Sequence, residues 1–382
     1  MKKAGTVFFV VLLFFLSAGF ARAQEYEYRY SPEEEGENDR ITEYASAFRE
    51  TLPEELSEES RELAEAALEG KSELSFSLLL RKSFFAITRE ATAPLRLLSL
   101  LLALLIVLSL FRSLGKSAEG NAGVAASFRL CSVLALSSCV LGTARHTVAA
   151  VRDILSSFNS FLFAMFPVLT SLYASGGKVG EAVAAHSALY LLTSFISDFC
   201  VRFILPAGGI LTALALAGAV LPFDLSGFSR WIKRLFSLSL ALASAALSAV
   251  LAFQTHISAA RDGLALRAVR FAAGSFIPVV GASLGEAFRT VAGSLSFLKT
   301  TIGWASVAVV LGLLLPVLLS LLLFRFSLGA ASACAKAIGC QKESGLMEEI
   351  SDVFGLYAGV VTAAGSVFIV AITLLVQSGG GE

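Results

Sequence analysis

Ser283 lies in a short pattern that many hydrolases use to present a nucleophile. Residues Gly281–Gly285 read GASLG and match G-x-S-x-G, and His256 is a candidate base. This nucleophile elbow needs a sharp turn between a strand and a helix, whereas the surrounding sequence is a long apolar run typical of a membrane helix. The same glycines form G-x-x-x-G, a spacing that lets helix backbones approach closely. We therefore favour helix packing over a serine-dependent intramembrane protease, and we predict that the protein is not an enzyme.

Two pairs of opposite charges lie within apolar stretches. Asp198 and Arg202 are spaced i,i+4, and Glu286 and Arg289 are spaced i,i+3, so each pair can neutralise itself on one face of a helix. Charged residues inside membrane spans are functional candidates by default because hydrocarbon solvates them poorly. Of two interpretations, an ion pair that locks helices together and a relay for protons or substrate, we favour the lock.

Metal, cofactor and nucleic-acid sites are not expected. The three histidines are far apart in the sequence, and the five cysteines contain no C-x-x-C pair, so neither a metal-ligand spacing nor a disulfide framework is present. The sequence has no Walker or GxGxxG motif. Its net charge is zero, so bulk electrostatics does not suggest nucleic-acid binding.

The composition requires a membrane environment. Of 382 residues, 56% are hydrophobic, and the mean hydropathy is +0.76, far above the range of soluble domains. A helix that crosses a bilayer needs about 20 mostly apolar residues, so we predict an all-α polytopic protein with about seven to nine transmembrane or re-entrant helices. The expected spans are Pro94–Leu114, Val124–Thr143, Ile154–Tyr173, Ala182–Phe199, Phe203–Leu221, Leu235–Thr255, Ala268–Ala287, Ile302–Phe324 and Val353–Val376, with Ser327–Ile338 as a short amphipathic segment.

Two of these spans contain a proline followed by valine, with small and polar residues nearby. A proline removes one backbone donor, and a broken helix survives in hydrocarbon only when it is buried or lines a water-filled cavity. We therefore predict that both broken Pro-Val helices are interior and are candidates for a pathway. The candidate pathway residues are Pro167, Val168, Gly176, Gly177, Gly274, Ser275, Pro278, Gly281, Ser283 and Gly285.

The Pro-Val segments belong to a wider similarity between two parts of the chain. An Arg-Asp pair precedes each one and a Leu-Pro pair follows each one, with Pro206 and Pro316 as predicted helix breaks. The offset of about 110 residues suggests an internal duplication, with repeats near 145–222 and 256–330. Chance matching in an apolar chain is the alternative, and we favour duplication. Whether the repeats are parallel or inverted stays open.

The N-terminus has the pattern of a secretory signal. Met1–Ala23 combines two lysines, an apolar core and an Ala-x-Ala ending, so we predict cleavage after Ala23 and consider an uncleaved anchor as the alternative. Residues 24–92 form an acidic extracytoplasmic region, disordered through Asp39 and helical from Ile41. The helical membrane domain covers residues 93–376, and residues 377–382 are a tail.

Loop charge gives an orientation for the membrane domain. With the acidic region outside, Arg112–Lys116 and Arg230–Arg234 fall on the cytoplasmic side, and Trp231 is a candidate interface anchor. The predicted loop Arg145–Asp153 then falls outside despite its arginines.

The most distinctive block of the sequence resembles the stage III sporulation protein AE family. The resemblance covers residues from about Leu74 to Val376, and two positions depart from the family pattern: Ser187 replaces a usual proline, and Arg270 replaces a common lysine. The matching features are the run Asp262–Gly303 with Phe-Ile-Pro-Val-Val-Gly, the run Pro167–Leu172, Gly176-Gly177, His186 and Leu205-Pro206.

This resemblance implies a polytopic protein of the mother-cell membrane that surrounds the forespore in endospore-forming bacteria. Its implied partners are membrane lipid, other stage III sporulation proteins including an ATPase, and a forespore membrane protein across the intermembrane space. Together they form a secretion-system-like channel required for late forespore gene expression. The chain is then either a conducting component or a non-conducting structural anchor. Polar residues that converge on Pro167 and Pro278 favour conduction, which is our preferred interpretation.

Overall fold

The computed structural model describes seven continuous stretches of the chain and a few isolated residues. The stretches are residues 35–53, 58–68, 91–116, 122–175, 194–221, 227–243 and 281–378, and the isolated residues are 191, 225, 245 and 249. The chain divides into a smaller unit, Met1–Glu50, and a larger one, Thr51–Glu382. The predicted signal peptide lies outside the described residues.

The smaller unit contains one described helix, α2, which covers Glu35–Glu50. The sequence pattern predicts a helix from Ile41, and α2 begins earlier, at Glu35. Residues 35–39, which the acidic composition assigns to a disordered stretch, are therefore helical. Near the end of the helix, the Ser46 hydroxyl donates to the carbonyl of Glu43 at 2.7 Å.

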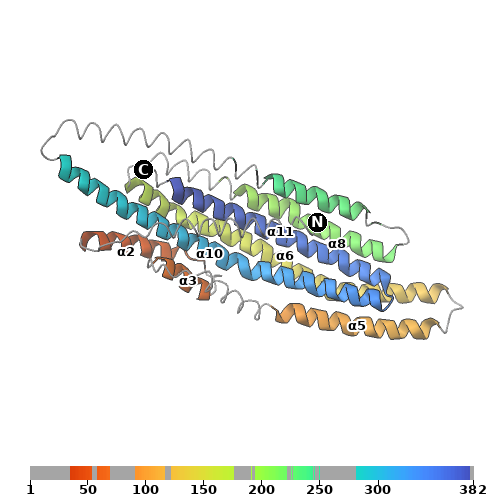
Figure 1. Ribbon diagram of the computed structural model, residues 1–382. Coiled ribbons are helices and arrows are strands. Elements are labelled where there is room, and N and C mark those ends of the chain that lie inside the picture. The colour runs from red at the N-terminus through yellow and green to blue at the C-terminus, as the bar shows by residue number, and fades with distance from the viewer. Residues whose placement is uncertain are drawn as a thin grey trace. The chain divides into compact units, whose positions relative to one another are not determined.

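The larger unit is helical throughout its described elements, and the residues that the structure describes contain no strand (Figure 1). The all-α prediction is therefore confirmed for this part of the chain. The helix of residues 227–243 follows α8 along the sequence. The other elements are α3 (Glu58–Leu68), α5 (Thr92–Lys116), α6 (Ala122–Ser175), the π turn η1 (Cys200–Ile204), α8 (Leu205–Val220), α10 (Gly281–Ala337) and α11 (Gln341–Ser378).

Helices α10 and α11 form a hairpin at the centre of this unit. Their turn is closed by two backbone hydrogen bonds, from the Cys340 amide to the Ala335 carbonyl at 2.8 Å and from the Gly339 amide to the Lys336 carbonyl at 3.1 Å. This is the Schellman pattern, which needs a left-handed residue after the helix. Gly339 supplies it with a φ of 85°, a conformation that a residue without a Cβ adopts without strain.

Small residues of α11 allow the hairpin helices to pack closely. Gly365 lies directly against the side chain of Leu314, and Gly355 lies against the guanidinium of Arg325. The hairpin also contacts the other helices of the unit: α10 packs on α3, α5 and α6, and α11 packs on α6 and α8. The α10–α11 hairpin is therefore the framework on which the other described helices are placed.

Five described helices are long and apolar enough to cross a membrane, by length and composition. The predicted count of seven to nine is not confirmed, because several expected spans fall partly or wholly outside the described residues, and so does much of the second predicted repeat. The five segments are Thr92–Leu110, Leu130–Met165, Ser194–Val220, Thr301–Ala337 and Gln341–Ile369.

Helix α6 corrects one part of the predicted topology. Two spans, Val124–Thr143 and Ile154–Tyr173, were expected with a loop between them, but α6 is one helix of 54 residues. No proline interrupts residues 122–166, and the charged residues Arg145, Arg152 and Asp153 lie exposed on the helix surface. At 1.5 Å per residue the helix is about 80 Å long, so part of it extends beyond a bilayer about 40–45 Å thick.

Helix α10 is also longer than the sequence predicts. The segment Ser327–Ile338 was expected to be separate from the span Ile302–Phe324, but α10 runs through both and contains Pro316 internally. Pro316 therefore does not end the helix. A proline costs one backbone hydrogen bond inside a helix, and packing of the apolar flanks against α11 offsets that cost.

Gly208 of α8 offers a test of how closely the helices pack. A Cβ at this position would overlap the ring and hydroxyl of the buried Tyr357, whose hydroxyl donates to the carbonyl of Leu205 at 3.3 Å. We expect Gly208→Ala to destabilise the protein by about 1–3 kcal/mol through overpacking. Thermal unfolding of the full-length protein in detergent measures this change.

The neighbouring Gly209 is the matched control, because nothing lies within 4 Å of a Cβ built there. Gly209→Ala should stabilise the helix by up to about 1 kcal/mol. Equal melting temperatures for Gly208→Ala and Gly209→Ala would contradict the packing of Tyr357 on α8.

Candidate functional site

Charged and hydroxyl side chains gather on the first turns of α11. This region contains carboxylates in a chain where charged residues make up only 16% of the sequence. We refer to it as the α11 polar cluster. Its members are Glu343, Glu349 and Asp352 on α11, Ser132 on α6, and Ser229 and Lys233 on the helix of residues 227–243.

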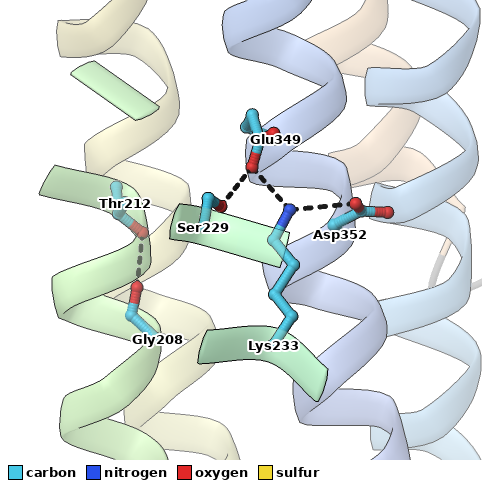
Figure 2. Close-up of polar contacts among 6 residues, drawn as sticks. All are labelled: Gly208, Thr212, Ser229, Lys233, Glu349 and Asp352. Atoms are coloured by element: carbon cyan, nitrogen blue, oxygen red, sulfur yellow. Dashed lines mark hydrogen bonds and ion pairs between the residues drawn. The ribbon is translucent and has the colours of Figure 1, made fainter. Parts of the chain in front are cut away.

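Lys233 is the centre of the cluster (Figure 2). Its ammonium nitrogen lies 2.5 Å from Glu349 Oε2 and 2.9 Å from Asp352 Oδ2. The lysine side chain is only 2% exposed, whereas Glu349 and Asp352 are 22% and 35% exposed. The hydroxyl of Ser229 donates to the same Glu349 oxygen at 2.6 Å. A buried cation is thus neutralised by two carboxylates that reach partly toward the surface, and the hydrogen bonds are charge-assisted.

Helical spacing brings these groups onto facing surfaces. Ser229 and Lys233 are four residues apart, and Glu349 and Asp352 are three apart, so each pair lies on one side of its helix. The two sides meet where the helix of residues 227–243 contacts α11 (Figure 2).

The helix of residues 227–243 exposes several large apolar side chains. Its buried side contains Ser229 and Lys233 beside the apolar Ile232 and Leu240. Its exposed side contains Arg230 and Arg234 together with large apolar residues, and the rings of Phe228 and Trp231 stack there with centroids 6.3 Å apart. Helices of soluble proteins place most of their large apolar residues inside. Exposed apolar and aromatic residues next to arginines are typical of a helix at a membrane interface.

Two further contacts bring α6 and α8 to the start of α11. The Ser132 hydroxyl on α6 donates to Glu343 Oε1 at 3.2 Å. The Lys342 ammonium donates to the Leu221 carbonyl at 3.2 Å, just beyond the C-terminal end of α8. Carbonyls at that end of a helix lack intrahelical partners and attract cations. These contacts place the C-terminal end of α8 and the early part of α6 beside the first turns of α11.

Helix α10 is attached to the same turns of α11. Ser332 and Ser344 share a hydrogen bond of 2.9 Å between their hydroxyl oxygens, and Ser351 donates to the carbonyl of Arg325 at 3.0 Å. On the exposed side, Lys336 and Glu348 form an ion pair of 2.6 Å. Four elements are thus tied to residues 341–352, a stretch about 18 Å long.

The chemistry of the cluster is ionic. Among the residues that the structure describes, no group of three His, Cys, Asp or Glu side chains could hold a metal ion. The polar contacts lie near the α10–α11 turn, at one end of the helices. Further along the hairpin the described interior is mainly apolar, for example at Leu314, Val360 and Phe368, with the buried Ser306 hydroxyl donating to the Ile302 carbonyl of its own helix. The arrangement therefore joins helix ends through buried charge.

The predicted pathway residues fall in several places. The predicted break at Pro167 is not present: α6 continues through it to Ser175, with Pro167 exposed and Val168 buried. Gly281, Ser283 and Gly285 form the helical start of α10, which is not the sharp strand-to-helix turn of a nucleophile elbow. The candidates outside the described residues are Gly176, Gly177, Gly274, Ser275 and Pro278, and the candidate base His256. A meeting of the two Pro-Val segments therefore stays a prediction.

The predicted ion pairs also differ in outcome. Asp198 and Arg202 form a contact of 3.2 Å between Oδ2 and Nη2, as their spacing predicts, although both side chains are largely exposed. Glu286 and Arg289 lie on α10, and their side chains are outside the described part. Pro206, a predicted helix break, is the second residue of α8, which begins directly after the π turn Cys200–Ile204. There the hydrogen bonding changes from π to α without interrupting the helix.

Sequence reasoning missed the cluster around Lys233. The lysine lies in Arg230–Arg234, which was interpreted only as a basic cytoplasmic loop. The available signal was the group of acidic residues between Glu343 and Asp352, directly before an apolar run. No pattern in the sequence indicates which basic residue pairs with them, since Lys233 and Glu349 are 116 residues apart.

Removal of the Lys233 charge should destabilise the protein. Lys233→Met leaves Glu349 and Asp352 without their cation. Breaking a fully buried pair costs about 3–5 kcal/mol, and partial exposure of the carboxylates should reduce this to about 2–3 kcal/mol. Unfolding of the purified full-length protein in detergent measures the loss.

Lys336→Met is the matched control, because Lys336 and Glu348 are 50% and 60% exposed and such a pair contributes about 0–1 kcal/mol. The triple variant Lys233→Met/Glu349→Gln/Asp352→Asn leaves no charge unpaired and should recover most of the stability. Similar losses for Lys233→Met and Lys336→Met would mean that Lys233 is not a buried partner.

Comparison with known proteins places the sequence in a family. The sequence pattern of the family described as stage III sporulation protein AE matches residues 59–379, a range that includes the whole α11 polar cluster. Stage III sporulation protein AE of Bacillus subtilis (strain 168) is 23% identical over 348 residues, which cover 90% of this chain and 84% of that protein. No solved structure matches the chain. The match over most of its length shows that this chain belongs to the stage III sporulation protein AE family.

Proposed function

We propose that this protein is a membrane component of a secretion-system-like channel or transport complex that links mother cell and forespore and is required for late forespore gene expression. Membership of a sporulation family supports the process. The five described helices that are long and apolar enough to cross a membrane, and the large apolar residues exposed on the helix of residues 227–243, support the membrane location. In this proposal the protein crosses the mother-cell membrane several times, and its acidic N-terminal region is extracytoplasmic.

The geometry of the described helices favours a structural part in that complex. The observation that carries this choice is the position of the α11 polar cluster at one end of the α10–α11 hairpin, where it ties α6, α8 and the helix of residues 227–243 to α11. Beyond it, the described interior is mainly apolar, and a buried hydroxyl such as that of Ser306 donates to the carbonyl of Ile302 in its own helix. Such a bundle can hold partner proteins at the membrane surface without conducting anything.

Conduction by this chain requires a polar path elsewhere, and the Pro-Val segment around Pro278 is the candidate. The chain contains no Walker motif, so energy would come from a partner, and the ATPase of the same complex is the proposed source. The other proposed partners are further stage III sporulation proteins and the forespore membrane protein across the intermembrane space.

The neutral triple variant separates the structural and conducting roles of the cluster. Lys233→Met/Glu349→Gln/Asp352→Asn keeps the side-chain volumes and removes all three charges, so no buried charge is left unpaired. If the cluster only joins helices, sporulating cells that carry this variant should show normal late forespore gene expression and normal amounts of protein. Lys336→Met/Glu348→Gln is the control. Normal protein amounts with lost expression would assign the charges to transport instead.

The Pro-Val path is tested separately at Pro278 and Ser275. Pro278→Ala restores a backbone donor, so the variant protein should accumulate in the membrane. If the segment lines a wet path, this variant should fail in late forespore gene expression, and a cysteine at Ser275 should react with a membrane-impermeant thiol reagent. An unreactive cysteine and a fully active Pro278→Ala protein would leave only the structural anchor.

A further inference from the structure

The Asp198–Arg202 pair lies on the outer surface of an apolar helix. Asp198 is 65% and Arg202 is 71% exposed, and both belong to the membrane-length segment Ser194–Val220. In the sequence, the nearest other acidic or basic residues are Glu181 before the pair and Asp224 after it, with His186 as the one histidine between them. An exposed ion pair thus lies inside a long stretch that is otherwise uncharged.

This ion pair is incompletely satisfied by itself. The contact joins one guanidinium nitrogen to one carboxylate oxygen, whereas a guanidinium has five donors and a carboxylate accepts about four hydrogen bonds. Hydrocarbon provides no partner for the remaining groups, and charged side chains that face lipid are rare for that reason. A polar surface of another protein would satisfy these remaining groups.

Aromatic and small residues surround the pair on the same segment. The rings of Phe195, Phe199 and Phe203 stack in sequence, with centroids 6.1 Å and 5.6 Å apart, and Phe195 and Phe203 are exposed. Further along the helix Gly209 is exposed, and open space surrounds the position of its Cβ. Stacked rings provide a wide apolar contact area, and an exposed glycine lets a second backbone approach closely.

We propose that this face binds a second copy of the same chain. The pair contains one charge of each sign, so the four charges of two copies sum to zero. A twofold axis along the membrane normal places equivalent residues at equal height, and each Arg202 must reach along the helix to Asp198 of the other copy. Two copies in one membrane run parallel, so these charges differ in height by one turn, about 6 Å, a distance that an arginine side chain spans. A different partner would have to supply its own matching acceptor and donor, whereas this chain already contains both.

Disulfide cross-linking in native membranes tests the proposal on the full-length protein. In a background whose five native cysteines are replaced, Phe203→Cys should form a dimer of twice the chain mass under mild oxidation. Leu134→Cys on α6, which is similarly exposed, is the control and should stay monomeric. Monomer at both positions, equal dimer at both, or a cross-link of another mass at Phe203→Cys would each overturn the proposal.

Charge variants then test the role of the pair in the cross-linking background. Arg202→Asp gives copies with two acidic groups, and Asp198→Arg gives copies with two basic groups, so each variant alone should lose the Phe203→Cys dimer through repulsion. Differently tagged copies of the two variants, expressed together, should restore it, as should the exchanged variant Asp198→Arg/Arg202→Asp. No dimer in either restored case would overturn the proposal. This assay measures association and not sporulation, so it is independent of the proposed function.

Discussion

Burial of the Lys233 ammonium between Glu349 and Asp352 is the constraint on which the described helices depend. A lysine with 2% exposure is tolerated only when its charge is compensated. Both carboxylates lie on α11, so the compensation fixes the rotation and height of the helix of residues 227–243 against that helix. The remaining contacts of the same α11 turns, with Ser132, Leu221 and Ser332, position α6, α8 and α10 in the same way.

The location of this constraint bears on function. Polar groups gather near the α10–α11 turn, and close apolar packing of the kind seen between Gly365 and Leu314 occupies the hairpin beyond it. Such a bundle is joined by ion pairs and hydrogen bonds near the turn and by apolar packing beyond it. A bundle joined in this way suits a component that holds other members of a membrane complex in place. The outward Asp198–Arg202 face adds a second surface on a different helix, so anchoring and self-association use separate parts of the chain.

Features that depend on residues close together in the sequence are easier to predict than contacts between residues far apart in it. The all-α class follows from the composition, and the Asp198–Arg202 contact follows from i,i+4 spacing, because helical geometry alone fixes both. The charged stretch at Arg145–Asp153 led to the prediction of a loop, which is wrong. A long helix can expose such charges on its surface as well as a loop can. The Lys233 cluster was not predictable, since only the tertiary fold brings residues 116 positions apart together.

A double-mutant cycle between Lys233 and Glu349 tests the central claim most directly. It requires the unfolding free energies of the full-length wild type, Lys233→Met, Glu349→Gln and the combined variant, all in the same detergent. Residues in one buried ion-pair network couple by about 0.5–3 kcal/mol, and the 2.5 Å contact predicts a value in the upper half of that range. Additive effects, with a coupling energy near zero, would contradict a buried Lys233–Glu349 contact and with it this account of how the helices are held together.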